Sequence, residues 1–317
     1  PEWRYFALLG AVSTFGFFLL GFFADNERVS FHWTLPGYLA LLPIVPSYAR
    51  LLVAAAERGP VVARQARDLV SVLSADRGVF VEPHDAERRE AAERARDVFV
   101  DASGDHATLL NALYGYLAAR AHAHGAHAGG GASAGARHEL RMWCQTHGVH
   151  ERTMRNVLAI RKQLMRICQQ HGLRCDDEAR GAGAARDVPR VDNDEDADGD
   201  ALIVTRGGGG PGTSAGAAGA EDYSALLQCL GQGRLSNTAL RQPDGTFRRI
   251  AGGLSFKLHP SCTLHPARHG ARGTSAASVQ AIVFEELVLT TQAFARTVSK
   301  IEPAWLQTLV NARATSS

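Results

Sequence analysis

The stretch FKLHPS at residues 256–261 leads through an apolar run into FEELVLTT at residues 284–291, and IEPAWL follows at residues 301–306. The apolar runs in this part of the chain are short and rich in β-branched residues, as strands of a small barrel require. Upstream of them, Pro243-Asp244-Gly245 is a turn signal between two strands. The pattern predicts a small β-barrel domain over residues 222–317, with a short helix at 224–230 and a closing helix at 306–313.

Residues 34–175 have a helical period instead. Asp105 stands at the start of one predicted helix, where a carboxylate commonly caps the first turn, and we expect it to do so. The charged stretch 87–96 predicts a helix with a solvated face. The fold class is therefore α+β and multidomain, with an all-α helical bundle followed by the barrel. Apolar residues at helical spacing occur in four sets: Tyr48, Leu51, Leu52 and Ala55; Val62, Ala66, Leu69, Val70 and Leu73; Leu109, Leu110, Leu113 and Leu117; and Met154, Val157, Leu158, Leu164 and Cys168.

Two low-complexity tracts interrupt this pattern. Residues 121–136 consist largely of Ala, Gly and His, which predicts a disordered insert within the helical domain. Its histidines have no fixed geometry there, so no metal site is expected. Residues 176–221 are first acidic and then rich in Gly, which predicts a linker between the two domains.

Composition is that of an ordinary soluble globular protein, with 45% hydrophobic and 21% charged residues. The formal net charge of +2 excludes a wholesale polycation, so any nucleic-acid contact must come from local patches of Lys and Arg. The five cysteines include no C-x-x-C pair, which favours reduced thiols in a cytosolic or nuclear compartment.

The segment 1–33 is the least typical part of the chain. Residues 7–23 carry no charge and approach the length of a membrane-spanning helix. Three glycines and the lack of a signal-peptide cleavage pattern argue against a membrane span. A buried helix and translated non-coding sequence are the competing interpretations.

The quoted stretches resemble the C-terminal oligonucleotide-binding (OB) fold domain of DEAH-box RNA helicases, whose hallmarks read roughly HPSSxL and then ELVxTTxxFxRxVxxIxPxWL. The helical region resembles the helicase-associated ratchet domain of the same family. The resemblance covers residues 34–172 and 222–310, and it implies an OB-fold barrel after a helical ratchet. The stretch Leu9-Gly10-Ala11-Val12 also resembles the end of the family's winged-helix domain. The ratchet stretches that carry the resemblance are Thr34-Leu35-Pro36-Gly37, Gly104-Asp105-His106, Trp143-Cys144 and Ile160-Arg161-Lys162-Gln163-Leu164.

The resemblance implies an RNA-binding module rather than a motor. Neither a G-x-x-x-x-G-K-[ST] phosphate loop nor a D-E-A-H stretch occurs in these residues, so this chain cannot hydrolyse ATP by the family's mechanism. No catalytic residue and no cofactor are expected in it, whereas ATP and Mg²⁺ belong to the parent family; whether the chain is part of an enzyme stays open. The implied partners are single-stranded RNA, RecA-like motor domains upstream of Pro1 and ribonucleoprotein components. The implied location is nuclear, nucleolar or cytoplasmic, and the implied process is ribosomal RNA processing or translation.

RNA contacts are expected from cations and polar groups at the barrel edge and on one ratchet helix. The competing interpretation is that His259 and Pro260 shape a turn, that the two threonines cap a helical turn, and that the ratchet cations form a solvated face. The predicted RNA-binding residues are Lys257, His259, Ser261, Thr290, Thr291 and Arg296 of the barrel, and Arg155, Arg161, Lys162 and Arg166 of the ratchet.

A second hypothesis comes from a different class of protein. The chain could be a motorless RNA- or protein-interaction protein, tethered to a membrane through residues 7–23. The two hypotheses differ over what precedes Pro1 and over whether the apolar segment is translated.

Overall fold

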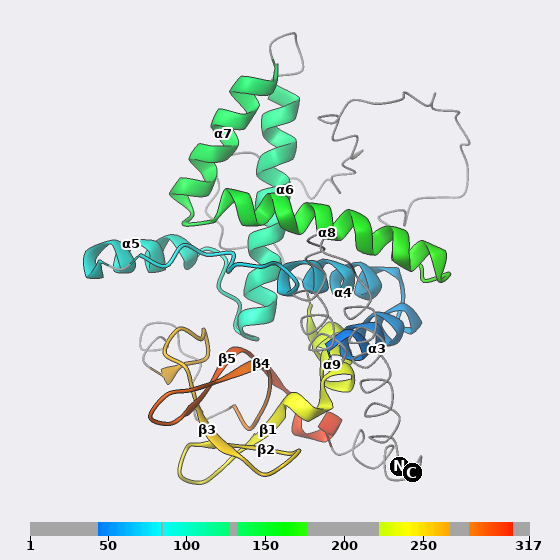
Figure 1. Ribbon diagram of the computed structural model, residues 1–317, viewed down its shortest axis with the longest axis vertical. Helices are drawn as coiled ribbons and strands as arrows, with labels where there is room; N and C mark the ends of the chain where they lie inside the picture. Colours follow the sequence, from blue (N-terminus) through cyan, green and yellow to red (C-terminus); the bar gives the residue numbers. More distant parts are fainter. Residues whose placement is uncertain (1–43, 84, 127–131, 176–221, 267–278, 307–317) are drawn as a thin grey trace, which may run out of the picture. The chain divides into compact units, whose positions relative to one another are not determined.

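The computed structural model describes residues 44–83, 85–126, 132–175, 222–266 and 279–306 (Figure 1). The predicted N-terminal segment 1–33 and linker 176–221 lie outside these residues, as does nearly all of the predicted helix at 306–313. The chain divides into two compact units, residues 1–49 and residues 50–317. Only the start of one helix is described in the first unit, and all other described residues of the two predicted domains belong to the second.

Helices make up the described part of the first domain, as the spacing predicted. Its centre is formed by α4, α6, α7 and α8, with α6 and α7 lying side by side (Figure 1). The helix α5 is mostly exposed, as its charges predicted. The bounds are α3 Ile44–Glu57, α4 Pro60–Leu73, α5 Ala86–Arg96, α6 Asp105–Ala126, α7 Ala132–Thr146 and α8 Glu151–Gln170.

Aromatic side chains fill the core of this helical domain. Phe99 lies between Phe80 and Trp143, with ring centroids 6.2 and 5.9 Å away. The Trp143 indole also packs edge to face with the ring of Tyr116, a buried residue of α6 in the same hydrophobic core. Burial raises the pKa of the Tyr116 phenol to about 12, so it stays protonated at any physiological pH.

The predicted disordered insert at 121–136 is wrong for most of its length. Helix α6 continues to Ala126 and α7 already begins at Ala132, so only residues 127–131 lie outside the described structure. Alanine has the highest helix propensity of all residues, and the packing of α6 against α7 supports both ends. The imidazole of His122 on α6 also contacts the Glu139 carboxylate of α7 at 3.1 Å.

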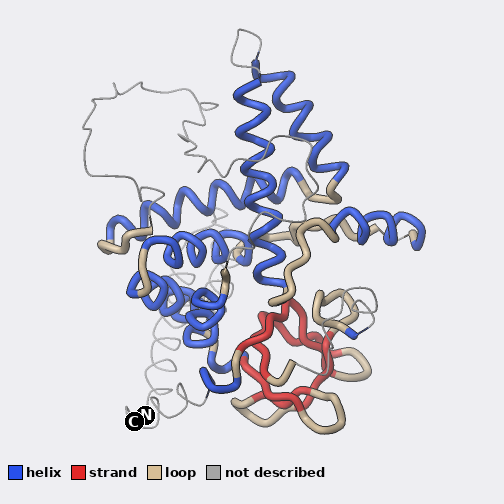
Figure 2. Tube along the Cα trace, turned by 180° about the vertical axis from the view of Figure 1, so that it is seen from behind, coloured by secondary structure: helices blue, strands red, loops and turns tan. Residues whose placement is uncertain are grey.

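The second domain is a closed barrel of five strands in the order β1-β2-β3-β5-β4, drawn in red in Figure 2. All neighbouring pairs are antiparallel except β3 and β5, which are parallel. The barrel core contains the buried side chains of Phe247, Phe256 and Phe284. The rings of Phe256 and Phe284 pack edge to face, with their centroids 5.0 Å apart. The elements are α9 Ser224–Gly233, η2 Leu235–Asn237, β1 Thr238–Arg241, β2 Phe247–Arg249, β3 Ser255–Leu258, β4 Ala281–Leu289 and β5 Ala293–Ile301.

The predicted turn at Pro243-Asp244-Gly245 is confirmed. The Gln242 amide donates to the Thr246 carbonyl and closes the hairpin between β1 and β2. Gly245 has φ 83°, a conformation that glycine adopts without steric cost. The five cysteines are unpaired and buried, in agreement with their spacing. In the described part of the chain, the helices are too short or too polar to cross a membrane.

Candidate nucleic-acid interface

The start of α6 is tied to the barrel by the Asp105 carboxylate. Its two oxygens accept hydrogen bonds from the backbone N–H groups of Thr263, at 2.8 Å, and Val298, at 2.7 Å. Asp105 was predicted to cap its own helix, and that prediction is wrong. Both carboxylate oxygens accept hydrogen bonds from backbone amides of the barrel instead.

The neighbouring His106 is fully buried in the same junction. Its backbone N–H donates to the Ser299 hydroxyl at 3.1 Å, and its Nδ1 lies 2.9 Å from the same oxygen. On its other side, Nε2 lies 3.2 Å from the Glu285 carboxylate, which also binds Arg234 at 2.8 Å. These contacts connect α6, β4, β5 and the end of α9 into one polar network.

Gly104 allows the two domains to approach this closely. It pairs with Ser299 of β5 as an isolated bridge and has φ 125°. A Cβ atom at this position would lie 2.4 Å from the Val298 carbonyl oxygen. Only glycine fits both the dihedral angle and the space.

A cleft of about 500 Å³ opens beside this junction, and we call it the Arg296 cleft. Its barrel wall carries Ser261, Thr263, Arg296 and Thr297, together with Glu286. The facing wall belongs to the helical domain and includes Phe80, Glu82, Arg96 and His150. The Arg96 guanidinium stacks over the Phe80 ring at 5.5 Å. Arginine side chains from both domains thus line one cleft.

Arg296 is held only loosely by the barrel. Its guanidinium lies 3.8 Å from the Glu286 carboxylate, and both side chains are substantially exposed. An ion pair of this kind contributes little to stability and can exchange for another anion. The cleft can therefore offer Arg296 to a phosphate group.

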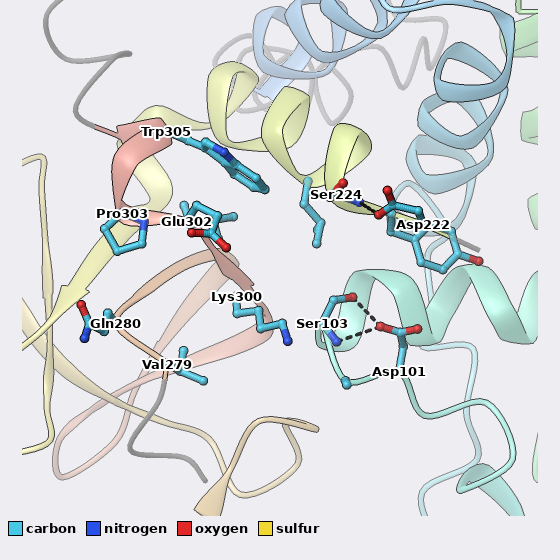
Figure 3. A pocket seen from close by; sticks show the side chains of 14 residues that line it. Asp101, Ser103, Asp222, Ser224, Val279, Gln280, Lys300, Glu302, Pro303 and Trp305 are labelled. Atoms are coloured by element: carbon cyan, nitrogen blue, oxygen red, sulfur yellow. Dashed lines mark hydrogen bonds between the residues drawn. The ribbon is translucent and has the colours of Figure 1, made fainter. Parts of the chain in front are cut away.

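A second cleft, of about 780 Å³, lies on the other side of the Ser103 turn, and we call it the Lys300 cleft (Figure 3). The Lys300 side chain extends toward Ser103, and Trp305 lines the barrel side. Three carboxylates, from Asp101, Asp222 and Glu302, line this cleft together with one ammonium group, and such an excess of negative charge disfavours phosphate. The Arg296 cleft also has three carboxylates, from Glu82, Asp105 and Glu286, but it has two guanidinium groups, and both oxygens of Asp105 are bound by barrel amides. The Arg296 cleft is therefore the better candidate for nucleic acid.

The predicted barrel residues fall into two groups. Arg296, Ser261 and the adjoining His259 lie at or beside the Arg296 cleft. Thr290 and Thr291 are exposed in the hairpin between β4 and β5, where the Thr290 amide donates to the Gln292 carbonyl. The alternative that these threonines cap a helical turn is wrong, because the chain makes a β-hairpin there.

Lys257 lies on β3 and is not part of the lining of the Arg296 cleft. It is exposed and pairs in register with Phe294 of β5. With Arg241 and Phe294 it lines a small pocket of about 160 Å³. A cation beside an aromatic ring is a common arrangement for contacting single-stranded nucleic acid.

His259 has a structural position. Its Nδ1 accepts from the Ser261 backbone N–H at 3.1 Å and lies 2.7 Å from the Ser261 hydroxyl. Burial, with a further contribution from the Arg296 charge, lowers the pKa of the imidazole. The ring is therefore mainly neutral at neutral pH and shapes the turn, which the competing interpretation anticipated.

The predicted ratchet cations are all on α8 but differ in environment. Arg155, Lys162 and Arg166 are exposed, and Arg155 lies 3.8 Å from the Glu151 carboxylate. Arg161 is instead 12% exposed and binds the buried Asp68 carboxylate of α4 at 2.8 Å. Its guanidinium joins α8 to α4, so it is not presented on the solvated face.

Other residues of the interface were missed from the sequence. Arg96 was part of a predicted solvated helix, and Phe80 and Thr297 carried no signal. Their importance comes from long-range packing, which residue spacing within one helix or strand does not contain.

Two family models match the chain in the order of its two domains. One, described as a ratchet-like helicase-associated domain, covers residues 45–109. The other, described as an oligonucleotide/oligosaccharide-binding fold, covers residues 226–312. These ranges fall on the helical domain and on the barrel.

Curated relatives align across most of the chain. ATP-dependent RNA helicase DHX33 of Drosophila melanogaster is 26% identical over 84% of this chain and 28% of its own length. Probable ATP-dependent RNA helicase DHR2 of Saccharomyces cerevisiae is 28% identical over 86% of this chain and 30% of its own length. The chain thus spans less than a third of the length of these relatives. Ratchet and barrel, in this order and with these relatives, support a C-terminal helicase module similar to that of DEAH-box RNA helicases.

Proposed function

We propose that this module binds single-stranded RNA and serves as the accessory region of an ATP-dependent RNA helicase. The observation that carries the proposal is the Arg296 cleft, in which Arg296 of the barrel and Arg96 of the ratchet line the same concave surface. A strand in the cleft would meet positive charge from both domains. Lys257 and Arg155, exposed on the barrel and on α8, would extend the backbone contacts.

In this proposal the module holds RNA and performs no chemistry. ATP hydrolysis and the RecA-like motor domains that perform it are assigned to the rest of the parent protein. The polar network around His106 would keep ratchet and barrel together while the strand is held. The implied location is the nucleus, nucleolus or cytoplasm, where such substrates occur.

The test is binding of a fluorescent oligouridylate to the 317-residue chain, measured by anisotropy over a series of salt concentrations. Affinity should fall steeply as salt rises, because phosphate contacts release counterions. Lys257→Ala and Arg296→Ala should each weaken binding and reduce the salt slope by about one. Arg88→Ala is the matched control, since Arg88 is 83% exposed on α5 and lies outside the cleft. Absent or salt-insensitive binding would overturn the proposal.

The process served is proposed to be ribosomal RNA processing or translation. One Arabidopsis thaliana relative, 22% identical, is named a pre-mRNA-splicing factor ATP-dependent RNA helicase, which points to a different process. Crosslinking of the protein in cells followed by RNA sequencing separates the two. Ribosomal RNA or messenger RNA coding regions should be enriched, whereas enrichment of spliceosomal RNA or introns would contradict this assignment.

A further inference from the structure

Thr297 has an unusual backbone conformation in the wall of the Arg296 cleft. Its φ of 51° is the one positive value at a non-glycine residue in the described part of the chain. A β-branched residue rarely adopts this conformation, and strained residues of this kind concentrate at ligand sites. The strand ladder passes from the pair Phe284–Val298 to the pair Glu286–Arg296 without a change of register, but Thr297 is not paired with Glu285 between them.

The conformation of Thr297 is imposed from both sides. The next residue, Val298, gives its N–H to Asp105, and the preceding residue, Arg296, is paired with Glu286 across the hairpin. The contacts of its two neighbours, Arg296 and Val298, therefore fix the backbone of Thr297 in the cleft wall. A strained position that the surrounding structure maintains in this way is a reason to look for a ligand.

Thr263 supplies a second and independent observation. It lines the same cleft, is only 7% exposed, and its hydroxyl oxygen has no hydrogen-bond partner among the described residues. Two other hydroxyls of the cleft are engaged, since Thr108 donates to the Gly104 carbonyl and Ser261 contacts His259. An unpaired hydroxyl shielded from water costs free energy, which a hydroxyl-bearing ligand could recover.

The cleft thus combines two kinds of group on one surface. Arg296 and Arg96 suit a phosphate, while Thr263 and Thr297 suit a neutral hydroxyl. The carboxylates of Glu82, Asp105 and Glu286 are in the same lining and repel a phosphate. Those of Glu82 and Glu286 can accept a hydrogen bond from a hydroxyl, whereas both oxygens of Asp105 already bind barrel amides. A ribose 2′-hydroxyl both donates and accepts, and it is the group that distinguishes RNA from DNA.

We propose that the Arg296 cleft seats one ribonucleotide, with its phosphate at Arg296 and Arg96 and its 2′-hydroxyl at Thr297 and Thr263. The inference rests on the proposed RNA-binding function and adds sugar discrimination to it. Thr297 is the specificity-determining residue, because it lines the same cleft as Arg296 and can therefore contact the sugar attached to the phosphate that Arg296 binds.

The test compares three oligonucleotides of equal length on the 317-residue chain: oligouridylate, its 2′-deoxy form and its 2′-O-methyl form. The ribose form should bind roughly three- to tenfold more tightly than the other two, the range that one or two neutral hydrogen bonds produce. Thr297→Val keeps the branched shape and removes the hydroxyl, so it should weaken only the ribose form. Thr297→Ser should keep the preference.

Two further variants make the result decisive. Thr263→Val should also reduce the preference for ribose, and it does not depend on the strained backbone at Thr297. Thr146→Val removes an exposed hydroxyl on α7, outside the cleft, and should change nothing.

Each outcome has a distinct meaning. Equal affinity for the three oligonucleotides, or a Thr297→Val variant that weakens all three alike, overturns the sugar discrimination but leaves RNA binding intact. Loss of binding to all three by the unsubstituted chain overturns the proposed function itself.

Discussion

Asp105 of α6 and Val298 of β5 are joined by a hydrogen bond of 2.7 Å between a carboxylate oxygen and a backbone N–H. They are separated by 193 residues in the chain, so the bond fastens the ratchet to the barrel. Hydrogen bonds to charged groups contribute more than neutral ones, and here one carboxylate makes two.

Asp105→Asn should therefore lower the free energy of unfolding by about 2–3 kcal/mol, because the amide group of Asn cannot accept from both N–H groups. Urea denaturation of the whole chain measures the loss. Asp97→Asn is the control, since Asp97 is exposed just after α5 and should change stability by less than about 0.5 kcal/mol. Equal stability of the two variants would mean that the Asp105 contacts do not stabilise the junction.

Gly104→Ala should be among the most damaging small substitutions in the chain. It combines an unfavourable φ with a Cβ atom 2.4 Å from a carbonyl oxygen of β5, and we expect a loss of about 3 kcal/mol or more. Gly59→Ala separates the two causes, because Gly59 has φ 112° but nothing within 4 Å of its added Cβ. The difference between their melting temperatures reports the close approach alone. A smaller effect at Gly104 than at Gly59 would contradict the packing described for the junction.

Arg161 and Arg166 should differ although both are cations of α8. Arg161→Met leaves the buried Asp68 carboxylate with one fewer partner, and it should cost about 3 kcal/mol. Arg166→Met changes an exposed side chain and should cost less than about 0.5 kcal/mol. Thermal unfolding followed by circular dichroism provides the comparison. Similar losses for both would mean that the Asp68 pair does not hold α8 against α4.

Glu286→Gln should strengthen RNA binding. The Glu286 carboxylate lies 3.8 Å from the Arg296 guanidinium, so its removal leaves this cation available to bind phosphate. The substitution also removes a negative charge that repels the phosphate. We expect roughly a threefold gain in affinity at low salt, fading as salt rises. Glu302→Gln in the Lys300 cleft is the matched control, and it should leave affinity unchanged. A gain at Glu302 equal to that at Glu286 would point to overall charge rather than to the Arg296 cleft.

The stability of the barrel should depend on pH through His259. Its pKa in the folded state lies below its ordinary value of 6.5, chiefly because of burial and secondly because of the Arg296 charge. The unfolded chain therefore binds the proton more readily, so the contribution of the neutral ring is present above the unfolded pKa and is lost as pH falls below it. Urea titrations of the unsubstituted chain and of His259→Asn should diverge above about pH 6.5 and converge in acid. Parallel curves throughout would show that His259 does not contribute to the pH dependence.

The helices and the β1–β2 turn were predictable because their signals are local. A stripe such as Met154, Val157 and Leu158 repeats with the helix, and Pro243-Asp244-Gly245 fits only a few turn geometries. The insert at 121–136 was mispredicted for a related reason. Its low complexity indicated a loop, but its alanines favour helix once α6 and α7 have each other to pack against.

For the candidate site, the sequence indicated which single residues could bind RNA, but it did not indicate which of them lie together in the folded protein. Arg296 and Lys257 were recognisable as cations near the barrel motifs, yet nothing in their spacing showed that they line different pockets. Arg161 was indistinguishable from its neighbours on α8 until Asp68 of α4 was seen beside it.

The order of ratchet and barrel, and their similarity to DEAH-box RNA helicases, were evident from the amino-acid sequence, because periodicity and short motifs are properties of neighbouring residues. That Asp105 binds the barrel, that Gly104 lies against β5 and that Thr297 lines a cleft became evident only in the folded protein. The partners of Asp105 are backbone amides 158 and 193 residues away. Since every non-proline residue carries such an amide, no side-chain pattern can indicate which ones the fold will bring to that carboxylate.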